Sequence, residues 1–430
     1  MKLGGDHSFW LYIHPHVHMS YKRSHVIFYN TLNGALLEYR DCDIRRMVGK
    51  LNYDWNLNVI RLRKDELTPK VDSFIHDIRR FFIGDVIEAS IKRYKPVQLK
   101  PIPKLKKISK ELLTSMNKSL LEMDEIYDCL DHVTLYINED CQLDCTLCND
   151  AFRQFTFCHK SDRAKNELDI DDLRGLFEEL QRFRLIQLDI IGGNIFRYSK
   201  LAELFQLLHG FKTNKHFYVH ILNIKERLNV DFFSEDRSNV LDVLIHLPMD
   251  RSLFKQKAEY LNKLDVKKVF HFVVNSEDNL TQSEQLISDF QIEEFRFHPF
   301  FDGSNLDFFK EHVFIDKESL LSNRLSMNEI FTREKLNASD FKKITVRSDN
   351  SIYANVNHSL IGVLGKDRLT RTIARELNDG KSWNRVRKYV SPCKSCVYNA
   401  LCPPISNYEY VLKRYNLCNI YMDRNEKGER

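Results

Sequence analysis

In Cys141-Gln142-Leu143-Asp144-Cys145-Thr146-Leu147-Cys148, three cysteines are spaced C-x3-C-x2-C, directly after the strand-like stretch His132–Ile137. Three thiolates this close can ligate three irons of a cubane 4Fe-4S cluster and leave the fourth iron without a protein ligand. Zinc usually takes four ligands in C-x2-C pairs, and no second pair lies nearby in the sequence. The spacing therefore favours an iron–sulfur cluster, with a zinc site or buried thiols as the alternatives.

From about residue 131, strand-like and helical stretches alternate along the chain. The apolar and β-branched patterns predict strands at His132–Ile137, Leu185–Ile191, His216–Leu222, Val240–Leu247, Lys268–Val274 and Glu293–Phe297. The i, i+3, i+4, i+7 pattern predicts amphipathic helices at Leu168–Phe183, Leu201–Phe211, Ser252–Leu264 and Thr281–Phe290. Six such units, each of about 30 residues, predict an α/β fold with a parallel sheet wound into a full or partial barrel. Its chemistry is expected at the C-terminal ends of the strands.

The cysteine motif on the loop after the first strand resembles the defining motif of the radical SAM superfamily. The resemblance implies a partial (β/α)6 barrel with Cys141, Cys145 and Cys148 as ligands of a 4Fe-4S cluster. It also implies S-adenosylmethionine as cofactor, chelated to the open iron through its amino and carboxylate groups. The expected chemistry is hydrogen abstraction by a 5′-deoxyadenosyl radical, and no catalytic side chain is assigned.

A second resemblance lies at Ile190-Ile191-Gly192-Gly193-Asn194, where the superfamily carries a Gly-Gly-Glu motif at the end of the second strand. It implies that Gly192 and Gly193 let the backbone approach the methionine portion of the cofactor. Asn194 replaces the acid that binds the amino group. An amide oxygen can accept a hydrogen bond from an ammonium but carries no charge, so binding would be weaker. A plain Gly-Gly turn after a strand is the alternative.

Three further positions match cofactor contacts of the superfamily more loosely. Leu147 stands where an apolar residue packs on the adenine, and His246, at the end of the fourth strand, matches a polar contact to the ribose. Asn275, at the end of the fifth strand, is a similar candidate. Structural roles are the alternative for all three residues.

The C-terminal cysteines form a second group, Cys393-x2-Cys396-x5-Cys402 followed by Cys418. They resemble the SPASM extension of peptide-modifying radical SAM enzymes, which implies that these four cysteines hold one auxiliary 4Fe-4S cluster. Asp349–Asn355 resembles the hairpin of that extension, but Asn355 and Ser406 stand where the ligands of another auxiliary cluster are expected. We therefore predict two clusters in the whole chain. A structural zinc site is the alternative, because C-x2-C is equally good zinc geometry.

The N-terminal residues are expected to form a small winged-helix-like module. Strands are predicted at Phe9–His18, His25–Asn30 and Ala35–Tyr39, with an Asn-Gly turn at Asn33 and helices at Ile44–Leu51 and Val71–Phe82. The order of elements resembles the peptide-recognition element of ribosomal-peptide maturases, which captures a leader peptide as an added strand. A DNA-binding winged helix is the alternative, but no basic recognition helix is apparent.

The composition of the chain indicates which classes of protein and which cellular compartments are expected. The chain has 430 residues with 43% hydrophobic and 29% charged side chains, ten cysteines and a net charge of +5. No apolar run approaches the roughly 20 residues that a membrane span needs, and the N-terminus is unlike a secretory signal. Grouped cysteines favour metal ligation in a reducing cytoplasm, which leaves Cys42, Cys129 and Cys158 as structural thiols. The mixed charges do not indicate nucleic acid as a partner, and a membrane is not expected as a partner either.

The whole arrangement resembles the radical-SAM/SPASM-related proteins of Bacteroidales double-glycine peptide systems. The predicted domains are a leader-recognition module (1–90), a basic proline-containing linker and helix (91–130), the partial barrel (131–304), and a bridging region with the SPASM-like extension (305–430). The resemblance implies modification of a ribosomally made precursor peptide, with an electron donor such as flavodoxin or ferredoxin. Two alternatives are an iron–sulfur partner protein that presents peptide without turnover, and a zinc-binding module.

Overall fold

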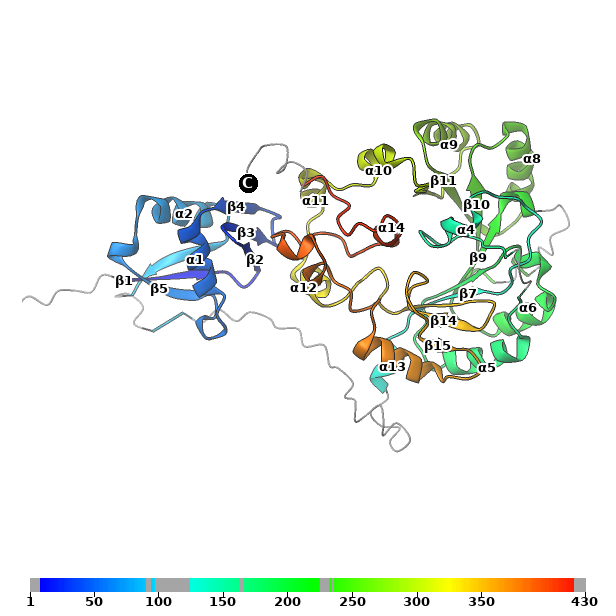
Figure 1. Cartoon of the computed structure of the whole chain (residues 1–430), viewed down its shortest axis with the longest axis horizontal. Helices are drawn as coiled ribbons and strands as arrows, with labels where there is room; N and C mark the ends of the chain where they lie inside the picture. The colour runs from blue at the N-terminus through cyan, green and yellow to red at the C-terminus, as the bar shows by residue number, and fades with distance from the viewer. Residues whose placement is uncertain are drawn as a thin grey trace, which may run out of the picture.

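The computed structural model describes residues 8–89, 94–96, 124–161, 166–224, 232–233 and 236–420. Figure 1 shows an N-terminal module at one side and a larger α/β body at the other. The predicted basic linker, with its lysines and prolines between residues 92 and 110, lies outside the described residues except for residues 94–96. No helix among the described residues has the length and apolar character that a membrane crossing requires.

The N-terminal module consists of two antiparallel three-stranded sheets, in the orders β5-β1-β6 and β2-β3-β4, with two α-helices. Its elements are β1 (Ser8–Ile13), β2 (Val17–Lys22), β3 (His25–Asn30), β4 (Leu36–Arg40), α1 (Cys42–Leu51), η1 (Asp54–Asn56), β5 (Val59–Arg63), η2 (Lys64–Glu66), α2 (Pro69–Arg80) and β6 (Gly84–Glu88). Both helices begin at side-chain caps, Asp41 for α1 and Thr68 for α2. The buried faces of strands and helices form a core of their own around Phe28, Phe74 and Ile78.

The prediction of one strand over Phe9–His18 is wrong. The chain turns at Pro15, where the backbone N–H of Val17 donates to the carbonyl of His14 at 3.1 Å. Proline lacks the N–H that a continuous ladder needs, so β1 ends at Ile13 and β2 starts at Val17 in the other sheet. The module therefore contains six strands instead of the three that were predicted.

The body is built on a nine-stranded sheet with the order β12-β11-β10-β9-β8-β7-β13-β14-β15. Strands β7 to β12 are all parallel to their neighbours, which confirms the six predicted strands. The elements of this part are η4 (Asp124–Asp128), β7 (His132–Tyr136), α4 (Cys148–Ala151), α5 (Ile170–Leu180), β8 (Gln187–Ile191), η5 (Ile195–Arg197), α6 (Leu201–His209), β9 (Asn214–His220), η6 (Ile221–Asn223), β10 (Asn239–His246), α8 (Arg251–Asn262), β11 (Lys267–Val274), α9 (Glu277–Asp289) and β12 (Phe295–Pro299). Figure 1 shows α5, α6, α8 and α9 along the outer side of this sheet.

The rest of the chain extends the sheet instead of forming a separate layer. Strand β13 pairs in parallel with β7, and β14 and β15 follow in antiparallel register. The elements are α10 (Leu306–His312), α11 (Lys317–Ser322), α12 (Met327–Lys335), β13 (Lys343–Val346), β14 (Ser351–Tyr353), β15 (Gly362–Val363), α13 (Leu369–Asp379), η7 (Arg387–Tyr389), η8 (Cys393–Ser395) and α14 (Asn407–Val411). The hairpin expected near Asp349–Asn355 is therefore β13–β14, with Asn350 in its turn at a φ of 67°.

One face of the sheet β2-β3-β4 packs on the C-terminal region, as Figure 1 shows. The buried residues of this contact, which we call the seam, are Ile27, Tyr29, Leu320, Leu325, Ile330, Val397, Tyr398, Ala400 and Leu401. Four of them lie between Cys396 and Cys402 in the sequence. The loop of the second cysteine group is thus also the surface on which the N-terminal module rests.

Glu38 of β4 is the polar centre of the seam. It accepts a hydrogen bond from the hydroxyl of Tyr398 at 2.5 Å, lies 2.7 Å from Nε2 of His25 and pairs with Lys317. The hydrogen bond from His25 is the main cause that holds the pKa of Glu38 well below its ordinary value; partial burial acts in the opposite direction. The carboxylate is therefore charged at neutral pH and joins the two parts of the chain.

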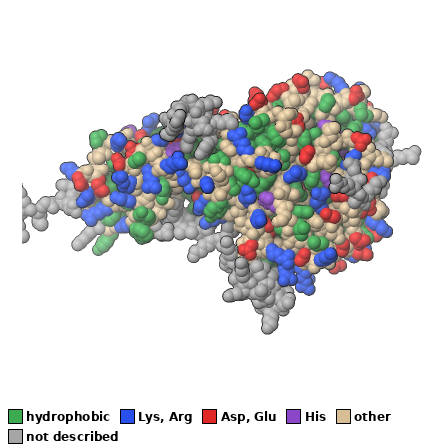
Figure 2. Space-filling view, in the orientation of Figure 1, with side chains coloured by type: hydrophobic (Ala, Val, Ile, Leu, Met, Phe, Trp, Pro, Cys, Tyr) green, Lys and Arg blue, Asp and Glu red, His purple; other side chains and the backbone are tan. Residues whose placement is uncertain are grey.

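On the face drawn in Figure 2, basic and acidic side chains both occur on the module and on the body. This distribution agrees with the mixed charges of the sequence.

Replacing Glu38 by Gln tests the seam. The amide keeps the shape of the side chain but loses charge-assisted hydrogen bonds, and we expect a loss of about 1–2 kcal/mol in docking free energy. Hydrogen exchange in β2 to β4 should rise in E38Q but stay unchanged in E178Q, a variant of an exposed glutamate on α5.

The same contact has a defined pH dependence. Since folding lowers the pKa of Glu38, its stabilising contribution is complete above the ordinary glutamate value of 4.5 and is lost as the pH falls below it. Exchange protection of β2 to β4 that is equal at pH 7 and pH 3.5, after correction for intrinsic rates, would contradict this role.

Candidate functional site

The candidate site lies where β7 and β8 end. The parallel register pairs Tyr136 with Ile191, so the chain leaves both strands at the same edge of the sheet. The loop with Cys141, Cys145 and Cys148 follows β7, and the turn Gly192–Asn194 follows β8. The sheet therefore brings together the two segments that the sequence marks as a cluster site and a cofactor site.

Nitrogen groups surround the sulfur atoms of the first cysteine group. The backbone N–H of Lys160 donates to Sγ of Cys148 at 3.1 Å. Leu143 N and Asn223 Nδ2 approach Sγ of Cys141 at 3.5 and 3.7 Å. Hydrogen bonds to cysteine sulfurs are among the factors that set the potential of an iron–sulfur cluster.

His220, at the end of β9, lies beside the same loop. Its Nε2 is 3.9 Å from Sγ of Cys145. Burial, followed by the proximity of His246, lowers the pKa of His220 to about 4, while burial raises that of Cys145 to about 11. His220 and Asn223 were not predicted as site residues, although His220 lies within the predicted strand His216–Leu222 and Asn223 directly follows it.

The spacing of the cysteine sulfurs can be compared with that of a zinc site. Zinc–sulfur bonds of 2.3 Å in a tetrahedron place the sulfurs about 3.8 Å apart. Over the described ranges, which include all seven predicted cysteine ligands, no three cysteine sulfurs lie within 4.8 Å of one another.

Both glycines of the turn are required by close packing on the loop after β7. A Cβ atom on Gly192 would lie 2.2 Å from Oδ1 of Asn138, and one on Gly193 would lie 2.6 Å from the carbonyl oxygen of Asp140. The backbone N–H of Asn194 donates to the same carbonyl at 2.8 Å. The glycines thus hold the cysteine loop against β8, in addition to any contact with a cofactor.

Asn194 is buried and caps η5. Its Oδ1 accepts a hydrogen bond from the backbone N–H of Phe196 at 3.1 Å. The oxygen that was predicted to accept a hydrogen bond from the ammonium group of the cofactor therefore already accepts one from the protein. An amide oxygen has a second lone pair, which could accept another hydrogen bond.

The three other residues predicted to contact the cofactor, Leu147, His246 and Asn275, lie in different surroundings. Leu147 is buried with Tyr136, Phe157 and Ile191 in an apolar cluster beneath the cysteine loop. His246 ends β10, and burial lowers its pKa. Asn275 uses both ends of its amide locally, donating to Asp302 at 3.0 Å and accepting from Asn279 at 2.6 Å.

The second cysteine group is fixed by a buried ion pair. Arg387 and Glu409 are 7% and 0% exposed, and their closest atoms are 2.6 Å apart. The guanidinium also donates to the carbonyls of Pro404 and Tyr415 and lies 3.7 Å from Sγ of Cys393. Arg387 therefore ties together the segments that carry the cysteines.

The positions where further cysteines were expected have structural roles. The amide of Asn355 donates to Asp340 at 2.9 Å and to Asn407 at 2.7 Å. Ser406 precedes α14 and forms a capping box with Glu409. These contacts account for the polar residues at both positions.

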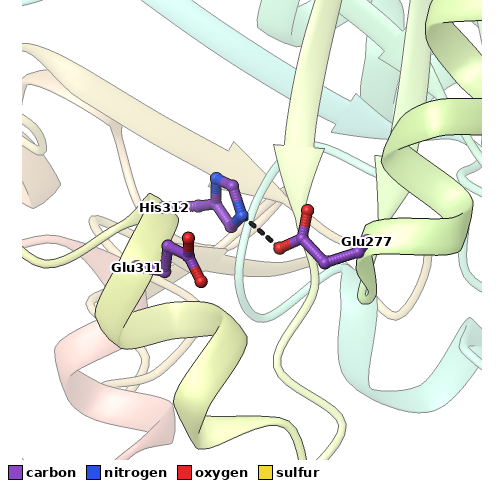
Figure 3. A group of neighbouring side chains, drawn as sticks. All are labelled: Glu277, Glu311 and His312. Atoms are coloured by element: carbon purple, nitrogen blue, oxygen red, sulfur yellow. Dashed lines mark hydrogen bonds and ion pairs between the residues drawn. The ribbon is translucent and has the colours of Figure 1, made fainter.

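A different group of side chains could hold an ion. Glu277, Glu311 and His312 place one ligand atom each within 4.8 Å of one another, between the start of α9 and the end of α10 (Figure 3). All three are exposed, and His312 is already paired with Glu277. The group contains none of the residues predicted from the sequence.

A cavity of about 310 Å³ lies against β7, β9, β11, β12 and β13. Its lining includes His132, Tyr218, His271, Arg296, His298 and Lys343. None of the predicted site residues lines it. Sequence patterns do not reveal this cavity, because its polar side chains come from strands far apart in the chain.

Comparison with known proteins supports the fold. No protein-family model matches the sequence, and no curated protein sequence matches it. The structure is similar to that of Streptococcus suis SuiB bound to the precursor peptide SuiA, with 12% identity, a TM-score of 0.50 and coverage of 95% of this chain and 98% of SuiB. It is equally similar to SuiB bound to S-adenosylmethionine, with 13% identity, a TM-score of 0.50 and coverage of 95% and 97%. The chain therefore shares its fold with SuiB over nearly its whole length.

The close approach of the two loops predicts that Gly193→Ala is destabilising. The new methyl group would meet backbone atoms of Asp140, which cannot move as a side chain can, so we expect a loss of about 1–3 kcal/mol in unfolding free energy. Urea denaturation measures this loss, and iron content after reconstitution should fall with it.

Gly175→Ala is the matched control. Gly175 lies in α5, and a Cβ atom added there would have no neighbour within 4 Å, so alanine should stabilise the helix by up to about 1 kcal/mol. Equal stability of the two variants would contradict the packing role of Gly193.

Proposed function

We propose that this chain is a radical S-adenosylmethionine enzyme that modifies a ribosomally made precursor peptide. One observation carries the proposal: the C-x3-C-x2-C loop and the Gly-Gly turn lie side by side at the C-terminal edge of a parallel sheet. Chemistry in sheets of this kind belongs at that edge. The fold shared with SuiB supports the same proposal, since SuiB has been crystallised with S-adenosylmethionine and with its precursor peptide.

Cys141, Cys145 and Cys148 would hold the first 4Fe-4S cluster, with N–H groups of Lys160, Leu143 and Asn223 directed at two of their sulfurs. When bound, the cluster and S-adenosylmethionine supply a carbon radical that removes hydrogen from a substrate. The buried apolar residues around Leu147 would keep water from the reacting atoms. Residues Gly192–Asn194, His246 and Asn275 are the proposed contacts to the cofactor.

The remaining parts are assigned by the same proposal. Cys393, Cys396, Cys402 and Cys418 would hold an auxiliary 4Fe-4S cluster, and the N-terminal module would bind the leader of the peptide at a sheet edge. A flavodoxin or ferredoxin would donate electrons in the cytoplasm. The seam supports a functional link, because Tyr398 lies between two of these cysteines and contacts β4 through Glu38.

A second candidate is an iron–sulfur protein that presents a peptide without turnover. Asn194 is the observation that favours it, since its uncharged oxygen also caps η5. The third function is that of a zinc-binding module; among the described residues, no group of three cysteine sulfurs within 4.8 Å of one another supports it.

Anaerobic reconstitution separates the three functions. We expect about eight irons per chain, from two cubane clusters, and 5′-deoxyadenosine after addition of dithionite and S-adenosylmethionine. Iron without 5′-deoxyadenosine favours the non-catalytic partner. Zinc without iron contradicts both cluster-containing functions.

Single cysteine variants assign the clusters. Cys145→Ala should lose about four irons and all 5′-deoxyadenosine, whereas Cys402→Ala should lose a similar amount of iron but keep cofactor cleavage. Cys42→Ala is the control, because Cys42 is exposed and belongs to neither group. Full iron content in Cys145→Ala would contradict the assignment.

Asn194→Asp tests whether the uncharged amide of Asn194 weakens binding of the cofactor. Aspartate also caps helices, so η5 should persist, while a charged acceptor adds about 1 kcal/mol to a hydrogen bond from an ammonium group. Titration calorimetry should therefore give about fivefold tighter binding of S-adenosylmethionine.

The control is Asn262→Asp, which adds the same charge at the exposed end of α8. Equal affinities in the two variants would remove Asn194 from the proposed cofactor contacts.

A further inference from the structure

Four polar side chains form a hydrogen-bonded chain across the inner face of the sheet. Oδ1 of Asp242 in β10 lies 2.7 Å from Nε2 of His271 in β11, and Nδ1 of His271 lies 2.8 Å from Nε2 of His298 in β12. Oδ2 of Asp242 lies 2.8 Å from Nδ1 of His216 in β9. The parallel register of these strands places the four side chains close enough for direct hydrogen bonds between neighbouring strands.

Charge and burial fix the direction of each hydrogen bond. Asp242 and His271 are 1% and 2% exposed, so solvent does not compete for their atoms. Although burial alone would raise the pKa of Asp242, hydrogen bonds from His216 and His271 bring it below its ordinary value. The carboxylate can only accept, so His271 donates through Nε2–H. When His271 is neutral, its Nδ1 accepts from Nε2–H of His298. His298 is then left with a lone pair on Nδ1.

His298 stands at the boundary of the 310 Å³ cavity. The ring of Phe155 packs on it with centroids 4.8 Å apart, which fixes its orientation. Burial, with smaller effects of the same sign from His271 and Arg296, lowers the pKa of His298 to about 3, while Asp242 acts in the opposite direction. The ring is therefore neutral at pH 7. Within the described part of the chain, its Nδ1 has no hydrogen-bond partner.

We propose that this cavity receives a side chain of the substrate through an N–H or O–H group that donates to Nδ1 of His298. The inference rests on the proposed function, which identifies the substrate as a peptide. It adds the chemical class of the bound side chain, which carries an N–H or O–H group and is not a hydrocarbon. The network ends in an acceptor on a side chain that lines the cavity.

The same geometry provides a path for a proton. If the donor loses its proton, Nδ1 of His298 gains it, Nε2 of His298 gives its own proton to Nδ1 of His271, and the electron pair of the broken bond stays on the substrate atom. The positive charge then rests on His271, 2.7 Å from the carboxylate of Asp242. His271 and Asp242 act as positioning residues in this path, because neither needs to touch the substrate.

The tautomers of His271 and His298 can be measured without substrate, and they test the hydrogen-bond directions assigned above. Selective ¹⁵N-histidine labelling of the full chain, as isolated, should give neutral Nε2–H signals for both His271 and His298 at pH 7. His298→Gln identifies the second signal, and His209→Gln, a change at an exposed site at the end of α6, is its control. An Nδ1–H tautomer or a charged ring for His298 in the unaltered chain would overturn the proposal. Two-bond couplings from the ring nitrogens to the ring protons assign the signals in the unaltered chain if His298→Gln does not fold.

Phenol and anisole test the acceptor directly. Both are small enough for the cavity, but only phenol carries an O–H donor. Loss of one such hydrogen bond typically costs about 1–1.5 kcal/mol, so phenol should bind about tenfold more tightly and should shift the Nδ1 resonance of His298. Equal shifts from the two probes, or none from phenol, would overturn the inference.

These measurements need neither cluster nor S-adenosylmethionine. A chain that binds phenol at His298 but forms no 5′-deoxyadenosine would keep the site and lose the proposed reaction. A chain that forms 5′-deoxyadenosine but does not discriminate the probes would keep the reaction and lose the site.

Discussion

The contact between the turn after β8 and the loop after β7 controls the candidate site. A parallel pair of strands sends both segments to one edge of the sheet, but only glycine lets them approach closely enough for Asn194 N–H to reach the carbonyl of Asp140. This contact holds the start of the cysteine loop, and His220 and Asn223 approach the same loop from the end of β9. A larger residue at position 192 or 193 would separate these segments whether or not a cofactor is bound.

The second cysteine loop is bound by two kinds of interaction at once. On one side Arg387 and Glu409 fix the segments that carry Cys393, and on the other the residues between Cys396 and Cys402 form the seam with the N-terminal sheet. Metal binding usually couples to local folding. A cluster on these cysteines would therefore also stabilise the surface that positions the N-terminal module. It would give the C-terminal cysteines a structural role beside any redox role.

The sequence predicted the features that depend on local patterns. The six parallel strands, the four intervening helices and the cysteine loop at a strand end follow from periodicity and spacing. The break at Pro15 has a local cause, and the proline inside the predicted strand was a signal for it. The addition of β13 beside β7 could not be predicted, because it depends on which distant strands pair. The same limit applies to the site: Asp242, His271 and His298 look like ordinary strand residues until three strands align.

Strand β9 connects the two places where polar chemistry is concentrated. Alternate residues face the same side of a strand, and His216, Tyr218 and His220 occupy three successive positions of this kind. His216 bonds to Asp242, Tyr218 lines the cavity, and His220 lies beside Cys145. Four residues of strand span about 13 Å, so the acceptor network and the cysteine loop are separated by little more than one layer of side chains. That layer contains Tyr136, Ile191 and Leu244 and is apolar. The cysteine loop thus borders an apolar layer, and groups able to bind a protic side chain lie on the far side of that layer.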